Sequence, residues 1–577
     1  MNDIRRTILW VIFGFSMVLL WDQWQVYNGH KATFFPSPAP VTAKANGSAP
    51  GQSNAVPVAP GATSPAGSAA QVPGTTATPT GIAAAPATAP AVHQQVVVTT
   101  DVFRLTFDTE GGSVVGVDLL KYPDEADKSQ PLALLEDNKD HEYVAQTGLI
   151  AGAGGGTFPT HKTIMTVVPG VRTLQPGVND LTVQFESPDL GGVKLVKTYT
   201  LHRDSYAISV KLDVVNTGTV PVSPQLYMQL VRDGSKPAAQ SRFASTFTGP
   251  AVYTDAKKYQ KIDFKKIDEN KVDIQNESNN GYVAMVQHYF ASAWLLGDGI
   301  PRNLFVRRIG ENPDLYAVGM ITPLNNIAPG TSRSVDAKLF VGPEEEKMLE
   351  SLAPGLELVK DYGWVTILAR PLYWLLYNIH RFLGNWGWSI VALVLLLKAA
   401  FYWLNAKAYG SMAKMKAINP KIMAMRERLK DKPQEMQQEM MKIYREEKVN
   451  PLGGCLPMVI QIPVFIALYW VLLSSVEMRG APWILWIHDL SAPDPYYILP
   501  VVMALTSLLQ TALNPAPPDP MQAKLMWIMP LAFSVMFVFF PAGLVVYYIT
   551  NNSLSILQQW IINTRMGVPP KFHLPKF

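Results

Sequence analysis

The 577-residue chain contains a single cysteine, Cys455, so no intramolecular disulfide can form. This cysteine ends the sequence LGGC, which looks superficially like a lipoprotein cleavage box. Such a box must follow an N-terminal signal, whereas this one lies deep in the chain. The sequence therefore gives no support to a lipid anchor at Cys455.

Charge is also scarce. Charged residues make up 16% of the chain and hydrophobic residues 48%, with a formal net charge of +4. That net charge is too small to argue for nucleic acid as a partner. The chain is too long for one compact domain, and its apolar residues gather in long runs that are typical of membrane proteins.

The motifs of common catalytic and cofactor sites are missing. The sequence has no phosphate-binding glycine loop, no HExxH, no Cys/His cluster and no evident nucleophile–base pair. Isolated histidines such as His202 and His488 are interpreted as surface or packing residues. We predict no catalytic residue, no cofactor and no metal, so any work is passive or driven from outside.

The N-terminal apolar run Thr7–Trp21 follows Arg5 and Arg6, a pattern of both cleaved signal peptides and uncleaved anchors. No small-x-small cleavage site follows, which favours an uncleaved anchor over residues 1–27 with its N-terminus in the cytoplasm. Residues 28–94 are rich in Pro, Ala, Gly, Ser and Thr. Such a segment buries too little apolar surface to offset its ordering entropy, so we expect a flexible linker.

Residues 95–345 have a period of two. Within Ile208–Val214 every second residue is apolar, and turn signals such as Pro329-Gly330 recur. Many short strands with regular turns are typical of an all-β sandwich.

Five later segments have the length and composition of membrane spans, and with the anchor they make six. Their bounds are 386–404, 456–473, 496–513, 525–540 and 544–562. The fold class we predict is therefore a multi-domain membrane protein, with an α-helical transmembrane core and a large all-β domain outside.

Residues 346–385 are the ambiguous part. The stretch Gly363–Leu383 is long enough to cross a membrane, but it contains Arg370, Pro371 and Arg381. Counting it as a span would put the loop 405–450, with eleven Lys/Arg against six Asp/Glu, outside the cell, against the positive-inside rule. We therefore expect an amphipathic helix in the outer interface.

The loop 405–450 has apolar residues at helical spacing, and Lys432-Pro433 divides them into two groups. This pattern predicts a cytoplasmic helical hairpin. Its methionines either pack the seam between the helices or offer an adaptable surface to apolar clients. They are Met412, Met415, Met425, Met436 and Met440.

Lys398 lies inside the first core span, where a central lysine costs about 3 kcal/mol on insertion scales. Either its stem lifts the ammonium toward the cytoplasmic headgroups, or the ammonium faces a wet cavity among the helices. Polar residues in other spans favour the cavity: Gln461, Thr506, Ser507, Gln510, Thr550, Asn551, Asn552 and Ser553.

Several stretches of this membrane region resemble the YidC/Oxa/Alb family of membrane protein insertases. The most specific is NPLGGCLPMVIQIPVFIALYWVL, at Asn450–Leu472, and the match extends over roughly 355–562. The other stretches that carry it are Ser411–Leu429, Ala481–Pro500, Asp519–Pro530 and Phe540–Asn552.

The resemblance implies a protein that eases hydrophobic segments of nascent proteins into the bilayer, alone or beside the Sec translocon. Five core helices would enclose a hydrophilic groove, open to the cytoplasm and to lipid and closed outside. The long outer domain and six spans look like the Gram-negative bacterial form. They imply an inner-membrane protein with both termini cytoplasmic and a periplasmic super-sandwich related to sugar-binding folds, although no sugar site is evident.

In most bacterial members the first core helix carries one arginine in the groove, and the matching residue here is Lys398. The positive charge is kept while the guanidinium fork is lost. From the match and the polar pattern together, the predicted substrate groove comprises Lys398, Gln461, Thr506, Gln510, Tyr547, Tyr548 and Asn551.

The partners implied are nascent membrane proteins, the Sec translocon, membrane lipids, the ribosome and the signal recognition particle receptor, with no direct contact to nucleic acid. The cytoplasmic tail 563–577 is short and mildly basic, so we expect only weak ribosome contact.

Two other classes of function stay open from the residues alone. One is a transporter or channel with Lys398 as counter-charge, although repeated halves and paired broken helices are not evident. The other is an anchored carbohydrate enzyme, which would need a pair of carboxylates in the β domain.

Overall fold

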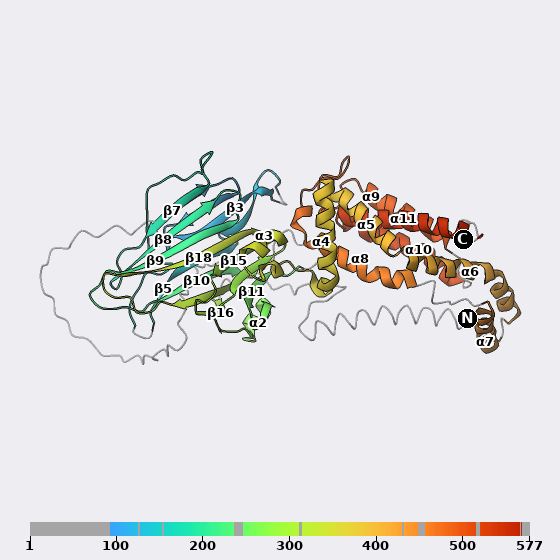
Figure 1. Cartoon of the computed structure of the whole chain (residues 1–577), viewed down its shortest axis with the longest axis horizontal. Helices are drawn as coiled ribbons and strands as arrows, with labels where there is room; N and C mark the ends of the chain where they lie inside the picture. Colours follow the sequence, from blue (N-terminus) through green and yellow to red (C-terminus); the bar gives the residue numbers. More distant parts are fainter. Residues whose placement is uncertain are drawn as a thin grey trace, which may run out of the picture. The chain divides into compact units, whose positions relative to one another are not determined.

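The computed structural model describes residues 93–124, 127–152, 155–235, 246–310, 314–429, 432–447, 456–514, 520–565 and 567. The predicted anchor, and the predicted linker up to residue 92, lie outside these residues. The described chain forms two compact units, one ending at Lys360 and one beginning at Asp361 (Figure 1). They are called the β unit and the helical unit.

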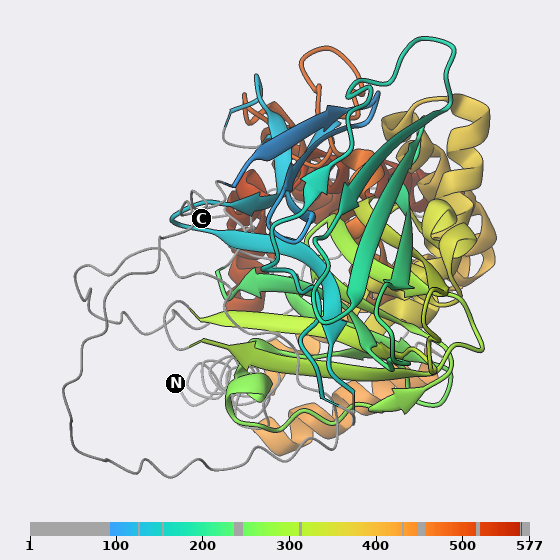
Figure 2. The ribbon, with the colours of Figure 1, turned by 90° about the vertical axis from the view of Figure 1, so that its left-hand side faces the viewer.

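The β unit consists of two antiparallel sheets, which confirms the predicted β-sandwich (Figures 1 and 2). The first sheet has the order β1 (Gln95–Thr99), β2 (Phe103–Asp108), β3 (Ser113–Pro123), β4 (Pro131–Asp137), β5 (Glu142–Ile150), β10 (Gln225–Asp233), β17 (Leu315–Pro323), β16 (Arg302–Ile309), β13 (Glu277–Ser278). The second has the order β12 (Lys258–Lys261), β11 (Gly249–Thr254), β14 (Tyr282–Gln287), β15 (Phe290–Leu296), β18 (Ser332–Pro343), β9 (Ala207–Asn216), β8 (Val193–His202), β7 (Asp180–Glu186), β6 (Thr166–Val167).

Alternation along each strand explains the two layers. In β8 every second side chain is buried, because strand residues point to opposite faces in turn and one face covers the core. The inner faces meet where the Trp294 side-chain N–H donates to the Gln229 carbonyl at 3.1 Å. The described residues of the β unit also form three short helices: α2 (Phe264–Asp268), α3 (Glu346–Leu352) and η1 (Leu356–Val359).

One buried position of β8 carries a lysine. The Lys197 side chain is fully buried and its Nζ donates to the carbonyls of Gly111, at 2.6 Å, and Thr147, at 2.7 Å. Because burial disfavours the charged form, it lowers the pKa of Lys197 from 10.5 to about 7.

The helical unit is built from eight helices and three short 3₁₀ turns within the described residues. They are η2 (Gly363–Val365), α4 (Thr366–Leu383), α5 (Trp386–Ala400), α6 (Tyr402–Arg428), α7 (Pro433–Glu446), α8 (Leu456–Ser474), η4 (Val476–Met478), α9 (Ile498–Leu513), α10 (Pro520–Met536), η5 (Phe537–Phe539) and α11 (Ala542–Arg565). The predicted helical C-terminal region is confirmed.

The helices pack around one apolar core. Helix α11 packs against α5, α6, α8 and α9, and α4 packs against α5 and α8. Buried residues such as Tyr373, Leu393, Leu468 and Val545 fill the interior. Many large apolar side chains remain on the outside, among them Leu505 of α9, which is 61% exposed.

Two predicted segments are divided differently in the structure. The segment 386–404 is not one straight helix, because α5 ends at Ala400 and α6 begins at Tyr402, with 69° between them. The region 346–385 is not one helix either: α3 and η1 belong to the β unit, and α4 begins only at Thr366.

We find no single helix among the described residues that is both long and apolar enough to cross a membrane alone. The bent pair Trp386–Ala400 and Tyr402–Met415 satisfies the length and composition together.

Candidate functional site

Lys398 points from the last turn of α5 to α11. Its Nζ donates a hydrogen bond of 2.7 Å to Ser555 Oγ, and that hydroxyl in turn donates to the carbonyl of Asn551 at 2.7 Å. The Lys398 carbonyl accepts from Gln558 Nε2 at 3.1 Å. The ammonium is therefore directed to a partner helix and does not extend along its own helix toward an end.

A small cavity lies beside this ammonium. Its volume is about 50 Å³, several times the 10–15 Å³ of probe-occupied space that one water needs. Five of its lining residues carry polar groups, and the described lining contains no carboxylate. The lining residues are Val394, Leu397, Lys398, Phe401, Asn405, Gln461, Val464, Tyr547 and Asn551.

Three helices supply the predicted groove residues found in this cavity. Lys398 lies on α5 and Gln461 on α8, while Tyr547 and Asn551 lie four residues apart on α11. Side chains four residues apart lie on the same face of a helix. The cavity thus brings together four of the seven predicted residues.

The other three predicted residues lie elsewhere. The Tyr548 ring packs on Phe465 and Phe537, with centroid distances of 5.6 and 5.1 Å. Thr506 of α9 faces α11 and accepts a hydrogen bond of 3.4 Å from Asn552 Nδ2, and Gln510 follows it on α9, half-buried. Thr506 therefore joins two helices without lining the cavity.

Two residues missed by the sequence analysis lie at this site, Ser555 as the partner of Lys398 and Asn405 in the lining of the cavity. Ser555 continues the face of Tyr547 and Asn551 by one more turn, and its hydroxyl holds the ammonium. Asn405, at the start of α6, lines the cavity and donates to Gln558 Oε1 at 3.3 Å. The four-residue spacing on α11 could have identified Ser555 as a member of this face. No pattern in the sequence could have identified Asn405, because its position at the site depends on the bend at Phe401.

The methionines of α6 and α7 mostly share one cluster. Ile418, Ile422 and Met425 are buried there, and Met415, Met436 and Met440 pack against them. Met412 lies outside this cluster, half-buried on α6. Packing between the two helices thus occupies most of the predicted methionine surface.

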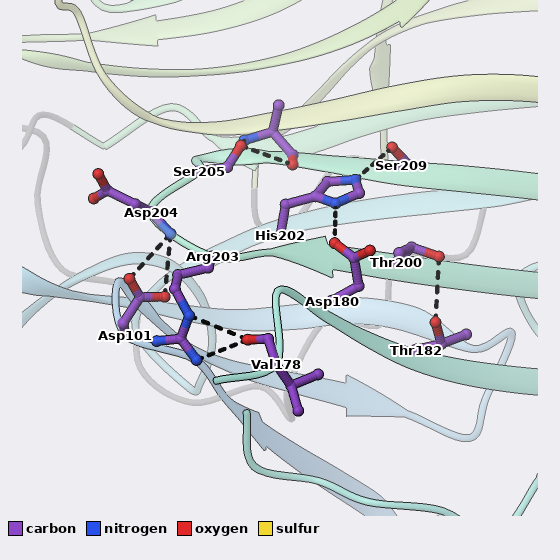
Figure 3. A network of polar contacts seen from close by, with 11 residues as sticks. Asp101, Val178, Asp180, Thr182, Thr200, His202, Arg203, Asp204, Ser205 and Ser209 are labelled. Carbon is purple, nitrogen blue, oxygen red and sulfur yellow. Dashed lines mark hydrogen bonds and ion pairs between the residues drawn. The ribbon is translucent and has the colours of Figure 1, made fainter. Parts of the chain in front are cut away.

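The β unit contains a polar network that resembles a catalytic relay (Figure 3). His202 Nδ1 lies 2.7 Å from Asp180 Oδ1, and its Nε2 lies 3.0 Å from Ser209 Oγ. However, β9 is paired on both sides, with β8 and β18, so the backbone amides around Ser209 are not free to form an oxyanion hole. We interpret the network as surface polar packing, as predicted for His202.

Metal binding has no support in the described residues, where no group of three His, Cys, Asp or Glu side chains is placed to hold an ion.

Comparison with known proteins assigns the chain to a protein family. The model of the YidC periplasmic domain matches residues 95–375, and the model of the 60Kd inner membrane protein matches residues 378–568. The chain belongs to the YidC family. Family membership makes it an inner-membrane protein whose β unit is the periplasmic domain, and this family is not one of catalytic enzymes.

Curated relatives match over nearly the whole chain. A protein named membrane protein insertase YidC from Cupriavidus metallidurans is 55% identical over 98% of both chains. Its namesake from Cupriavidus necator is 56% identical, also over 98% of both. A crystal structure of an active YidC insertase covers 80% of this chain and 91% of that one, at 19% identity and a TM-score of 0.36; the assignment to the family rests on the sequence matches alone.

Proposed function

We propose that this protein is an insertase that moves hydrophobic segments of nascent proteins into the bacterial inner membrane. The observation that carries the proposal is the ammonium of Lys398, held beside a polar cavity whose described lining has no carboxylate, in a helical unit that exposes many large apolar side chains. The names of the relatives support the same function.

The proposed topology has six spans, with both termini in the cytoplasm. The segments 386–404, 456–473, 496–513, 525–540 and 544–562 span the membrane together with the anchor 1–27. Helix α4 lies in the periplasmic interface, and its exposed apolar residues Ile367, Trp374 and Phe382 support contact with lipid. The charge of loop 405–450 supports its cytoplasmic position.

In this mechanism the groove shortens the distance that a client's polar flank travels through hydrocarbon. Each charge that keeps some hydration in transit avoids part of a desolvation cost of several kilocalories per mole. Lys398 offers a positive station to an acidic residue of the flank, because the cavity supplies no competing carboxylate. Thr506, Gln510 and Tyr548 extend the client path beyond the cavity.

The free energy for insertion comes from burial of the client's apolar helix in lipid, at about 25 cal/mol per Å². The membrane potential adds to it for charged flanks. The proposed partners are nascent membrane proteins and lipids, with the Sec translocon, the signal recognition particle receptor and, weakly, the ribosome.

Photo-crosslinking tests the proposal directly. A photoreactive amino acid at Gln461 should capture a ribosome-stalled client as its hydrophobic segment emerges. The control is the same group at Leu505, an exposed apolar position of α9 outside the cavity. Capture at Leu505 alone would contradict a client path through the cavity. Solute flux through reconstituted vesicles without client capture would favour a transporter.

A further inference from the structure

Besides the cavity at Lys398 in the helical unit, the structure has a hollow of about 420 Å³ in the β unit. It lies between β16 and the segment that precedes β13. This hollow is called the β16 groove, and its lining mixes apolar, amide and charged side chains. The lining residues are Val272, Ile274, Asn276, Glu277, Asn303, Leu304, Phe305, Val306, Arg307 and Ile321.

The β16 groove runs along an open sheet edge. On one side β16 pairs with β17 from Asn303 to Ile309, but on the other side it pairs with β13 only at Arg302 and Asn303. The last contact on that side is the bond from Leu304 N to the carbonyl of Asn276, at 2.6 Å. Further along β16, the side chain of Asp268 in α2 lies 3.6 Å from Arg308 Nη1, beyond the last lining residue, Arg307.

Between these two limits the backbone of β16 is available for pairing. In a strand the N–H and C=O of alternate residues point to the same side. Since Leu304 N points to Asn276, the N–H and C=O of Val306 also point into the groove, and no described strand pairs with them. Such an edge accepts a further strand readily.

Arg307 supplies a specific recognition group at this edge. Its Nε and Nη2 are buried and make no hydrogen bond within the described residues. The guanidinium lies over the ring of Phe305, 5.2 Å from the centroid, which holds it in place. Buried donors without acceptors are costly, and a carboxylate matches the guanidinium fork with two parallel hydrogen bonds.

The two ends of the β16 groove carry opposite charges. Glu277 pairs with Asn303, four residues before Arg307 on β16. At about 3.3 Å per residue the two opposite charges are roughly 13 Å apart along the strand. A negative group is therefore favoured at the Arg307 end and disfavoured at the Glu277 end.

We propose that the β16 groove binds a short, extended, acidic polypeptide segment, which pairs with Val306 as an added strand and places one carboxylate on Arg307. Alternate side chains of the segment fill the apolar wall formed by Val272, Ile274 and Ile321. This binding site is independent of the cavity at Lys398, so its success or failure does not decide the insertase proposal.

Fluorescence anisotropy on the full-length protein in detergent tests the site, with the labelled peptide STVDVTS as probe and STVNVTS as its neutral counterpart. We expect the acidic peptide to bind about tenfold more tightly, the equivalent of about 1.4 kcal/mol. Arg307→Gln should abolish this preference. Arg333→Gln removes an exposed arginine of β18 outside the groove and should leave the preference unchanged.

A second variant separates strand addition from simple charge attraction. Val306→Pro removes an outward N–H and leaves the ladder with β17 complete, as edge strands tolerate. It should weaken binding of both peptides. Should this variant fold poorly, hydrogen exchange of the wild-type protein gives the same information: the acidic peptide should slow exchange at the Val306 amide.

Equal affinity for the two peptides, a preference that survives Arg307→Gln, or unchanged exchange in β16 would each overturn the proposal.

Discussion

In the proposed mechanism, the group of the helical unit that attracts the client is the ammonium of Lys398. Its Nζ is held by Ser555 and has no carboxylate in the described lining of its cavity. The charge is thus available to a client, and a point charge needs no particular fork geometry.

We predict that Lys398→Glu reduces insertion of clients with acidic N-terminal flanks by about tenfold or more, because attraction becomes repulsion in a poorly screened site. Lys398→Arg should change insertion by less than about twofold. Protease-protected client in reconstituted vesicles is the measurement, and clients with neutral flanks are the control. Unchanged insertion of acidic clients by the glutamate variant would rule out an electrostatic station.

A second lysine gives a pH dependence in the β unit. The pKa of Lys197 is about 7 in the folded protein, against an ordinary value of 10.5. Between these values the unfolded chain binds a proton that the folded chain releases, so the free energy of unfolding should rise from pH 7 to pH 10.

Lys197→Met should remove this rise with pH, whatever its effect on stability at pH 7. Pulse proteolysis in urea at pH 7 and pH 9.5, read on fragments of the β unit, measures the slope. Lys338→Met, at an exposed position of β18, is the matched control and should keep it. An unaltered slope in the Lys197 variant would contradict the assignment.

At the residue scale, the sequence could predict which side chains share one face of a helix, but not which side chains of different helices meet. Tyr547 and Asn551 could be grouped because they lie on one helical face. The bond between Lys398 and Ser555 joins positions 157 residues apart, and depends on how α5 and α11 pack. No periodicity within either helix contains that information.

Among the elements, α4 illustrates the limits of a purely amphipathic reading. Ala369, Tyr373 and Leu376 are buried against the other helices, while Ile367 and Phe382 are 88% and 89% exposed. The outer side of α4 therefore also carries large apolar residues. Such a helix in water would expose much hydrophobic surface, whereas in an interface the outer side is covered by lipid.

We predict that Phe382→Asp weakens the attachment of α4 to the membrane and lowers insertion, because a carboxylate is costly where lipid covers the helix. Phe382→Leu should be neutral. Quenching of a fluorophore on α4 by brominated lipids measures its depth. The same depth in the aspartate variant would mean that α4 is held by protein contacts alone.

The main feature of the helices that could not be predicted from the sequence was the bend between α5 and α6. The segment 386–404 is apolar apart from Ser389 and Lys398 and contains neither Pro nor an internal Gly near Phe401, so nothing local marks a break. The strands were easier, because a buried face imposes a period of two that the sequence displays directly, as in Ile208–Val214.

In the whole molecule the two units have separate cores, and the proposed insertion chemistry lies in one of them. We therefore predict that deletion of residues 95–345 leaves about half or more of the insertion activity, since domains with their own cores fold independently. Membrane levels of the shortened chain, measured by immunoblot, control for expression. Complete loss at normal levels would assign the function to the β unit.

The central claim is that water reaches a polar cavity among the helices at Lys398. The decisive measurement is labelling of Gln461→Cys by a membrane-impermeant maleimide, in a Cys455→Ala background and with Lys398 intact. We expect labelling from the cytoplasmic side, and none at Leu505→Cys, which lies on an exposed apolar surface. A cysteine at 461 that reacts only with lipid-soluble reagents would contradict the account.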